Sequence, residues 1–269
     1  MKQIIYSYIL LLCYTISYSS CHPRLVPQGA TTPPTLNKEV TDERGKPQLL
    51  GKCTRERLEQ APYDSWFLKN YTDYAVDSVT AGLLRAKLED QRGHGSPGGI
   101  RFVIFMGTWC GDSQREVPRM FKILDYCGLD STAVQLIMVS DADSMYKQSP
   151  GHEEKGLNIF RVPDLIVLDK GKESGRIVES PVQSLEKDLL ALVDGDNYVP
   201  NYKGAALLVK VFREEKRAKI EGELPELAAR IKPLVRSPSE LKSYAHVLKA
   251  AGEGPKAAIV LQINALIFP

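Results

Sequence analysis

The sequence predicts an α/β domain followed by an all-helical C-terminal extension. Between residues 77 and 194, apolar runs of strand length alternate with helical patterns. Their order is strand, helix, strand and then strand, strand, helix, which favours one sheet covered by helices. A cysteine stands where the first of these strands, residues 100–106, gives way to a helix. Beyond residue 194 the pattern is helical throughout.

Composition bounds the class of protein. The chain has 269 residues, of which 43% are hydrophobic and 25% are charged, so it has room for one or two domains with their own cores. The formal net charge is +2. This charge is too small to favour nucleic acid or an anionic membrane surface as a partner.

The N-terminus reads as an export signal. Lys2 is followed by an apolar run over 4–16 and by small polar residues that end in Ser19, Ser20 and Cys21. The run is shorter than the ~20 residues that span a bilayer. Cys21 resembles the cleavage site of a bacterial lipoprotein, which predicts a lipid anchor at Cys21, with plain secretion as the alternative. Either route predicts an extracytoplasmic location, in the periplasm or cell envelope.

Residues 22–100 supply a tether and two helical segments. Residues 22–50 contain several prolines and show no regular period, which predicts a flexible tether. In the N-terminal extension 51–76, aromatic residues between positions 54 and 74 recur at spacings near three and four, which predicts a helical segment packed on the domain. Asp77 is a suitable N-cap for the next helix.

The remaining elements follow from apolar periodicity and turn residues. We expect strands at 100–106, 133–139, 164–168 and 176–179, and helices at 110–126, 143–157 and 184–193. The extension 195–269 predicts helices at 203–220 and 224–234 and a helical hairpin over 239–269. This hairpin resembles a tetratricopeptide unit in its apolar positions, among them Leu241, Tyr244 and Leu248. One such unit cannot bury its own face, so it should pack on neighbouring helices.

Cys110 is the main candidate for chemistry. It follows a buried strand and opens a helix, whose first turn carries unpaired N–H groups and the positive end of the dipole. Negative charge on sulfur is stabilised at such a position, which makes the thiol reactive.

The residues around this cysteine resemble thioredoxin. Trp109, Cys110, Gly111, Pro118 and Pro163 stand where that family has its Trp-Cys-Gly motif, its helix-kinking proline and its cis-proline. The resemblance covers 77–194 and implies a thioredoxin-like three-layer α/β/α sandwich.

The same resemblance implies roles for the neighbouring residues. Val162 and Pro163 would present backbone groups to an extended substrate segment. Trp109 and Gly111 would border that segment beside the cysteine. Protein disulfides or small thiols are the implied substrates.

Two residues beside the cysteine depart from the family. Ser113 occupies the position of the second cysteine, so its hydroxyl can bond to the Cys110 thiolate but cannot form a disulfide. Asp112 brings a carboxylate close to the sulfur and disfavours a second negative charge there. The motif therefore predicts a monothiol site that needs an external reductant to release its mixed disulfide.

The other cysteines leave one alternative open. Cys127 lies at the far end of the same helix, about 25 Å away, and is expected to be a buried apolar residue. Pairing of Cys53 with Cys110 is not excluded by the sequence. The four histidines are scattered without metal-ligand spacing, so neither a metal nor an organic cofactor is expected.

Two functions are consistent with these residues. The first is monothiol thiol-disulfide exchange of the reductase or isomerase type in the cell envelope. The alternative is a non-catalytic thioredoxin-fold binding module with a helical, peptide-binding tail, in which Cys110 serves only for packing.

Overall fold

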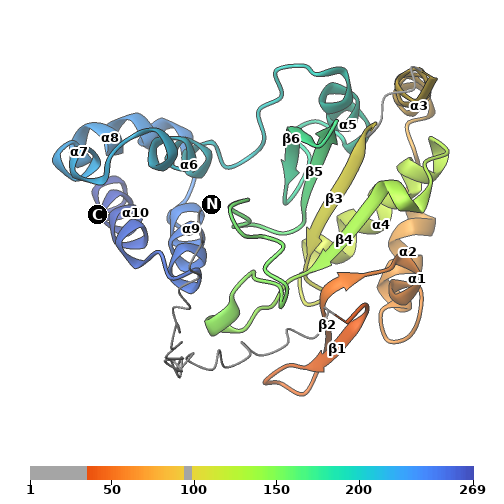
Figure 1. Cartoon of the computed structure of the whole chain (residues 1–269), viewed down its shortest axis with the longest axis horizontal. Coiled ribbons are helices and arrows are strands. Elements are labelled where there is room, and N and C mark those ends of the chain that lie inside the picture. Colours follow the sequence, from red (N-terminus) through yellow and green to blue (C-terminus); the bar gives the residue numbers. More distant parts are fainter. Residues whose placement is uncertain (1–34, 94–98) are drawn as a thin grey trace, which may run out of the picture. The chain divides into compact units, whose positions relative to one another are not determined.

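The computed structural model describes residues 35–93 and 99–269. The predicted signal 1–21, Cys21 with its anchor, and the first part of the tether lie outside these ranges. Within them, no helix combines the length and apolar character needed to cross a membrane. The described residues form an α/β structure around a mixed six-stranded sheet, followed by a group of helices (Figure 1).

The sheet combines two strands from residues 38–53 with four strands from residues 101–178. Its strands are β1 (Lys38–Thr41), β2 (Pro47–Cys53), β3 (Arg101–Met106), β4 (Val134–Met138), β5 (Asp164–Asp169) and β6 (Lys172–Val178). In space the order is β1-β2-β4-β3-β5-β6. Only β3 and β4 run parallel, and α4 (Gly111–Tyr126) supplies the crossover that a parallel pair needs.

One face of the sheet carries the larger core. Buried side chains reach it from α1 (Arg55–Leu58), α2 (Asp64–Asp73), α3 (Ser78–Gly93), α4 and α5 (Leu185–Asp194). Phe102, Ile104 and Met106 of β3 face this core, because alternate residues of a strand point to the same side. The predicted cap of α3 is confirmed, since the Asp77 carboxylate accepts hydrogen bonds from the N–H groups of Val79 and Thr80.

The opposite face is covered differently from the prediction. Its apolar side chains, including Phe105 and Ile137, pack with Ile159 and Val162 of the segment between β4 and β5. The predicted helix over 143–157 is wrong: this stretch holds only the 3-10 turn η2 (Asp143–Met145).

The backbone of this segment explains why it is irregular. Lys147, His152, Gly156 and Asn158 all have positive φ, which a right-handed helix does not accept. An irregular segment therefore lies where a three-layer sandwich would have its second helical layer.

The predicted tether over 22–50 is wrong from Lys38 onward. Residues 38–50 form β1 and most of β2, joined by a turn in which Gly45 has φ of 76°. β2 pairs with β4, and its Leu49 is fully buried in the core. Pro47 and the flanking charged residues hide this short alternating pattern in the sequence.

The predicted helical segment after residue 54 is confirmed as α1 and α2. Phe67 of α2 is fully buried and lies parallel to the ring of Tyr71, with 6.3 Å between ring centroids. It also contacts Phe121 of α4, at 6.1 Å. The extension is therefore part of the core that holds α4 in place.

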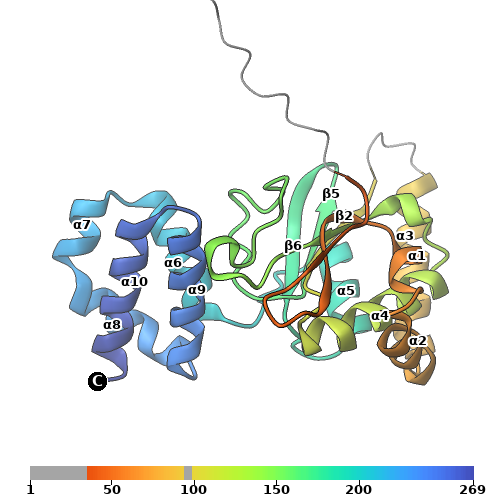
Figure 2. The same ribbon diagram turned by 90° about the horizontal axis from the view of Figure 1, so that it is seen from below.

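The C-terminal helices have their own apolar cluster. They are α6 (Lys203–Glu214), α7 (Arg217–Gly222), α8 (Leu224–Ile231), α9 (Pro238–Ala250) and α10 (Gly254–Ile267), with the 3-10 turn η3 (Lys232–Leu234) before α9. The predicted helix over 203–220 is divided at Glu215 into α6 and α7. α9 and α10 form the expected hairpin and pack on α6 and α8, as Figure 2 also shows.

Truncating Phe67 should destabilise the chain because it leaves a cavity between α2 and α4. We expect Phe67→Ala to lower the free energy of unfolding by about 3–5 kcal/mol. The neighbouring Leu68, which is 48% exposed, provides the control: Leu68→Ala should cost under ~1 kcal/mol. Urea denaturation of both variants measures the difference, and equal losses would contradict a core role for α2.

Candidate functional site

Cys110 lies at the N-terminus of α4, as the sequence predicts. Its N–H donates to the Gly107 carbonyl at 3.0 Å, and its own carbonyl accepts from the Gln114 N–H at 2.9 Å. Cys110 is therefore the N-cap residue, with extended backbone angles. Its half-buried sulfur stands beside the first turn of the helix, where the N–H groups favour negative charge.

The turn before β5 lies directly against this sulfur. The Cys110 thiol donates a hydrogen bond to the Val162 carbonyl, with 3.3 Å between sulfur and oxygen. The Val162-Pro163 peptide bond is cis, and both residues are buried. The structure thus brings together three of the predicted site residues from two distant parts of the chain.

Trp109 is held by its surroundings on one side of the cysteine. The indole Nε1 donates to the Val139 carbonyl at 2.9 Å, and the ring packs on the apolar cluster of the irregular face. A Cβ atom on Gly107 would clash with a carbon of this ring. Glycine at 107 therefore permits the close approach of the indole to the backbone.

Ser113 is oriented toward the backbone of the preceding turn. Its side chain is fully buried, and its Oγ accepts a hydrogen bond from the Gly107 N–H at 3.4 Å. The contact expected with the Cys110 sulfur is not among the hydrogen bonds of the described residues. Ser113 thus supports the turn that carries Cys110.

Gly111 is the first residue of α4, and a Cβ there would meet open space.

Asp112 does not act on the sulfur as an isolated charge. Its carboxylate accepts a hydrogen bond from the Arg115 guanidinium at 2.7 Å, and Arg115 also bonds to Glu116 at 2.6 Å. The expected repulsion between Asp112 and a Cys110 thiolate is therefore offset by the neighbouring cation.

A lysine that the sequence did not single out lies behind the Val162 turn. Lys147 is only 4% exposed, and its Nζ donates to the Phe160 carbonyl at 2.9 Å and to the Tyr146 hydroxyl at 2.8 Å. Ser243 of α9 is 3.4 Å away. Burial lowers the pKa of Lys147, and the hydrogen bond to Tyr146 acts in the opposite direction. Lys147 thus joins the turn, the irregular segment and α9.

Arg161 makes a second link between the turn and the C-terminal helices. Its guanidinium donates to the Ser239 carbonyl at 3.1 Å and to the Glu179 carboxylate at 3.3 Å. The same guanidinium lies over the Tyr202 ring, 4.9 Å from the centroid. Burial raises the pKa of Glu179, against the opposing effect of the Arg161 guanidinium.

Asp164, the residue after Pro163, is fully buried at the start of β5. Its Oδ2 lies 3.2 Å from the Arg176 guanidinium, while its Oδ1 is buried without a hydrogen-bond partner. Burial raises the pKa of Asp164 to about 6, against the opposing effect of Arg176. A titratable carboxyl thus stands next to the proline of the site.

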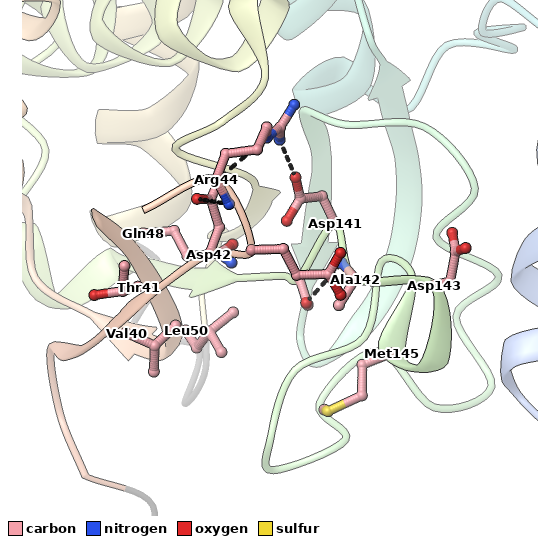
Figure 3. A pocket seen from close by; sticks show the side chains of 12 residues that line it. Val40, Thr41, Asp42, Arg44, Gln48, Leu50, Asp141, Ala142, Asp143 and Met145 are labelled. Carbon is pink, nitrogen blue, oxygen red and sulfur yellow. Dashed lines mark hydrogen bonds and ion pairs between the residues drawn. The ribbon is translucent and has the colours of Figure 1, made fainter. Parts of the chain in front are cut away.

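A hollow of about 580 Å³ lies between the β1–β2 hairpin and the residues that follow β4. Its lining includes Asp42, Arg44, Asp141 and Asp143. Figure 3 shows Arg44 extended toward Asp141, with 2.7 Å between nitrogen and oxygen, and a 3.3 Å contact joins Arg44 to Asp42. Arg44 therefore offsets part of the acidic charge.

Cys53 and Cys110 are free thiols, so the pairing of Cys53 with Cys110 is not formed. Cys53 and Cys127 are buried, and burial raises the pKa of Cys53 to about 12. Within residues 35–93 and 99–269, no group of acidic, histidine and cysteine side chains is arranged to hold a metal ion.

Comparisons with known proteins add little. No family model and no curated protein matches the chain. Among solved structures it is similar to the crystal structure of an HIV epitope-scaffold, with 16% identity over 50% of this chain and 99% of that chain. The TM-score is 0.27, so this similarity carries no argument. The candidate site therefore rests on its own geometry.

Sequence reasoning missed four charged residues around the turn, namely Lys147, Arg161, Asp164 and Glu179. Lys147 and Glu179 have positive φ, and Lys147 lies in a segment without periodicity. Asp164 did offer a signal, because an acidic residue opens an otherwise apolar strand directly after a proline.

Replacing Asp164 should change how stability depends on pH. The folded chain keeps the Asp164 proton up to about pH 6, whereas a free aspartate has a pKa of 3.8. The stabilisation from this proton is complete below pH 3.8 and is lost as pH rises through about 6. Between pH 4 and pH 7 the wild type should lose about 2–3 kcal/mol relative to Asp164→Asn.

Chemical denaturation at several pH values measures this difference. Asp169→Asn, at the exposed opposite end of β5, is the control and should leave the pH profile of the wild type unchanged. Parallel profiles for the wild type and Asp164→Asn would show that the Asp164 carboxyl titrates normally.

Proposed function

We propose that the chain is an exported, thioredoxin-like thiol-disulfide exchange protein that acts through the single thiol of Cys110. The observation that carries the proposal is the contact between the Cys110 sulfur, at the N-terminus of α4, and the Val162-Pro163 turn. A sulfur in this position is electrostatically suited to attack, and the turn lies beside it to receive a substrate segment.

The order of elements supports the thioredoxin-like assignment. Strand β3, helix α4 and strand β4 are followed by the hairpin β5-β6 and helix α5, and the cis-proline immediately precedes β5. The irregular segment between β4 and β5 and the serine at position 113 are departures from that family. The irregular segment changes one layer of the fold, and the serine removes the second sulfur that would resolve a mixed disulfide. Neither departure alters the contact between the Cys110 sulfur and the Val162-Pro163 turn.

The proposed reaction has two exchange steps. The Cys110 thiolate attacks one sulfur of a substrate disulfide, the substrate S–S bond breaks, and its second sulfur leaves as a thiolate that takes up a proton. Ser113 has no sulfur to resolve the resulting mixed disulfide. An external thiol must therefore attack that disulfide, release Cys110 as a thiolate and become bonded to the substrate sulfur in its place.

The setting proposed for this chemistry is the cell envelope. Substrates are protein disulfides or small thiols, and the second thiol comes from an external reductant. Cys21 would carry the lipid that anchors the chain to a membrane. No organic cofactor or metal is needed, because thiol exchange carries its electrons on sulfur.

The alternative is a non-catalytic binding module of the same fold. The observation that favours it is the hydrogen bond of the Cys110 thiol to the Val162 carbonyl, together with the position of Cys110 at the edge of an apolar cluster. As a binding module, the protein would use the Cys110 thiol only to stabilise the Val162-Pro163 turn. The C-terminal helices would then bind a peptide.

Formation of a covalent adduct distinguishes the two functions. We expect the folded wild type to form a stable mixed disulfide with oxidised glutathione at Cys110, measured by intact mass and peptide mapping under non-reducing conditions. Added thiol should release it. In Cys110→Ala the peptides that hold Cys53 and Cys127 should carry no adduct, because both of these cysteines are buried.

Cys53→Ala is the matched control and should retain the full adduct. An adduct of undiminished yield in Cys110→Ala would contradict the assignment. Failure of the wild type to react, with Cys110 proved accessible, would leave the binding module as the better function.

A further inference from the structure

A second hollow lies next to the Val162 turn. It has a volume of about 480 Å³, and its lining combines Arg161 with residues at the starts of α6 and α9 and in the loop before α9. The lining carries three cations, Arg161, Lys203 and Arg236, against the carboxylate of Glu240, and Arg161 is also paired with Glu179, which lies outside the lining. The hollow therefore has a positive balance of charge.

The carboxylate of this hollow is already used within the protein. Glu240 is 4% exposed, and its Oε1 accepts a hydrogen bond from the Ala205 N–H of α6 at 2.9 Å. Its charge thus offsets the N-terminus of α6. The same carboxylate also interacts electrostatically with Arg161 and Arg236, so it offsets part, but not all, of the positive charge of the hollow.

Two of the cations are free to meet a ligand. Lys203 and Arg236 are exposed, and neither forms an ion pair within the described ranges. Arg161 is fixed by Ser239 and by the Tyr202 ring, and its Nε is buried without a hydrogen-bond partner. Fixed and exposed cations thus share one hollow lined also by serine hydroxyls and an asparagine amide.

Two consecutive residues of the chain link the hollow to the cysteine site. Arg161 lines it, and the next residue, Val162, accepts the hydrogen bond of the Cys110 thiol. An extended peptide covers about 3.3 Å per residue, so a few residues on one side of its sulfur would span the stretch from Val162 to Arg161.

We infer that this hollow is an anion subsite that selects peptide substrates carrying Asp or Glu side chains near the reacting cysteine. The inference rests on the proposed function and names its substrate class. Lys203 and Arg236 would attract the carboxylates, while Arg161 would hold the turn between the subsite and Cys110. Because exposed cations act mainly through long-range attraction, the selection should appear in the rate of reaction and should weaken with salt.

Activated peptides test the subsite directly. Two blocked peptides are made with one cysteine each, held as a 2-pyridyl disulfide, and with Glu in one peptide and Gln in the other at positions flanking the cysteine. The Cys110 thiolate attacks the peptide sulfur and forms a new disulfide. The old S–S bond breaks, and the pyridine-2-thiolate that leaves takes up a proton, so pyridine-2-thione absorbance reports the rate.

The wild type should react roughly fivefold faster with the Glu peptide than with the Gln peptide at low salt, and about equally fast with both near 1 M salt. The double variant K203Q/R236Q should lose this preference. Lys210→Gln removes the same charge from α6 about 10 Å further along the helix, so it should keep the preference.

The outcomes separate the two proposals. Equal rates of the wild type with both peptides at low salt, or a preference that survives in K203Q/R236Q, would overturn the subsite and leave thiol exchange intact. Absence of reaction with either peptide, while free cysteine reacts with both, would overturn the proposed function itself.

Discussion

The antiparallel pairing of β3 with β5 is the constraint from which the candidate site follows. Phe105 near the end of β3 is opposite Asp164 at the start of β5. Because the two strands are antiparallel, the residues that follow β3 and the residues that precede β5 lie at the same end of the strand pair. Cys110 and Val162, 52 positions apart in sequence, are thereby brought within hydrogen-bond distance. Their contact is a consequence of strand register.

The C-terminal helices then fix the turn from its other side. Lys147 and Ser243 both donate to the Phe160 carbonyl, and Arg161 donates to Ser239 of α9. Burial of the Lys147 ammonium group carries a desolvation cost, which lowers its pKa, and these hydrogen bonds offset part of that cost. A turn tied in this way is preorganised, so a substrate would not have to order it.

Local patterns predicted the elements that hold Cys110, whereas long-range contacts decided the rest. The strand before Cys110, the helix after it and the Asp77 cap follow from residues close in sequence. β1 and β2 do not, because the burial of Leu49 depends on pairing with β4, more than eighty residues away. The helix expected over 143–157 failed because residues such as Lys147 adopt positive φ to reach their tertiary partners. The orientation of Ser113 toward Gly107 likewise depends on a fold that spacing alone does not describe.

Selective modification of Cys110 in the folded chain tests this picture most directly. Cys53 and Cys127 are 7% and 1% exposed, whereas Cys110 is partly exposed at a helix N-terminus. A time course of iodoacetamide alkylation at neutral pH, resolved by peptide mapping, compares all three within one sample. Cys110 should be modified roughly a hundredfold faster than either buried cysteine. Modification of Cys110 at the rate of Cys53 or slower would contradict its role as the reacting thiol.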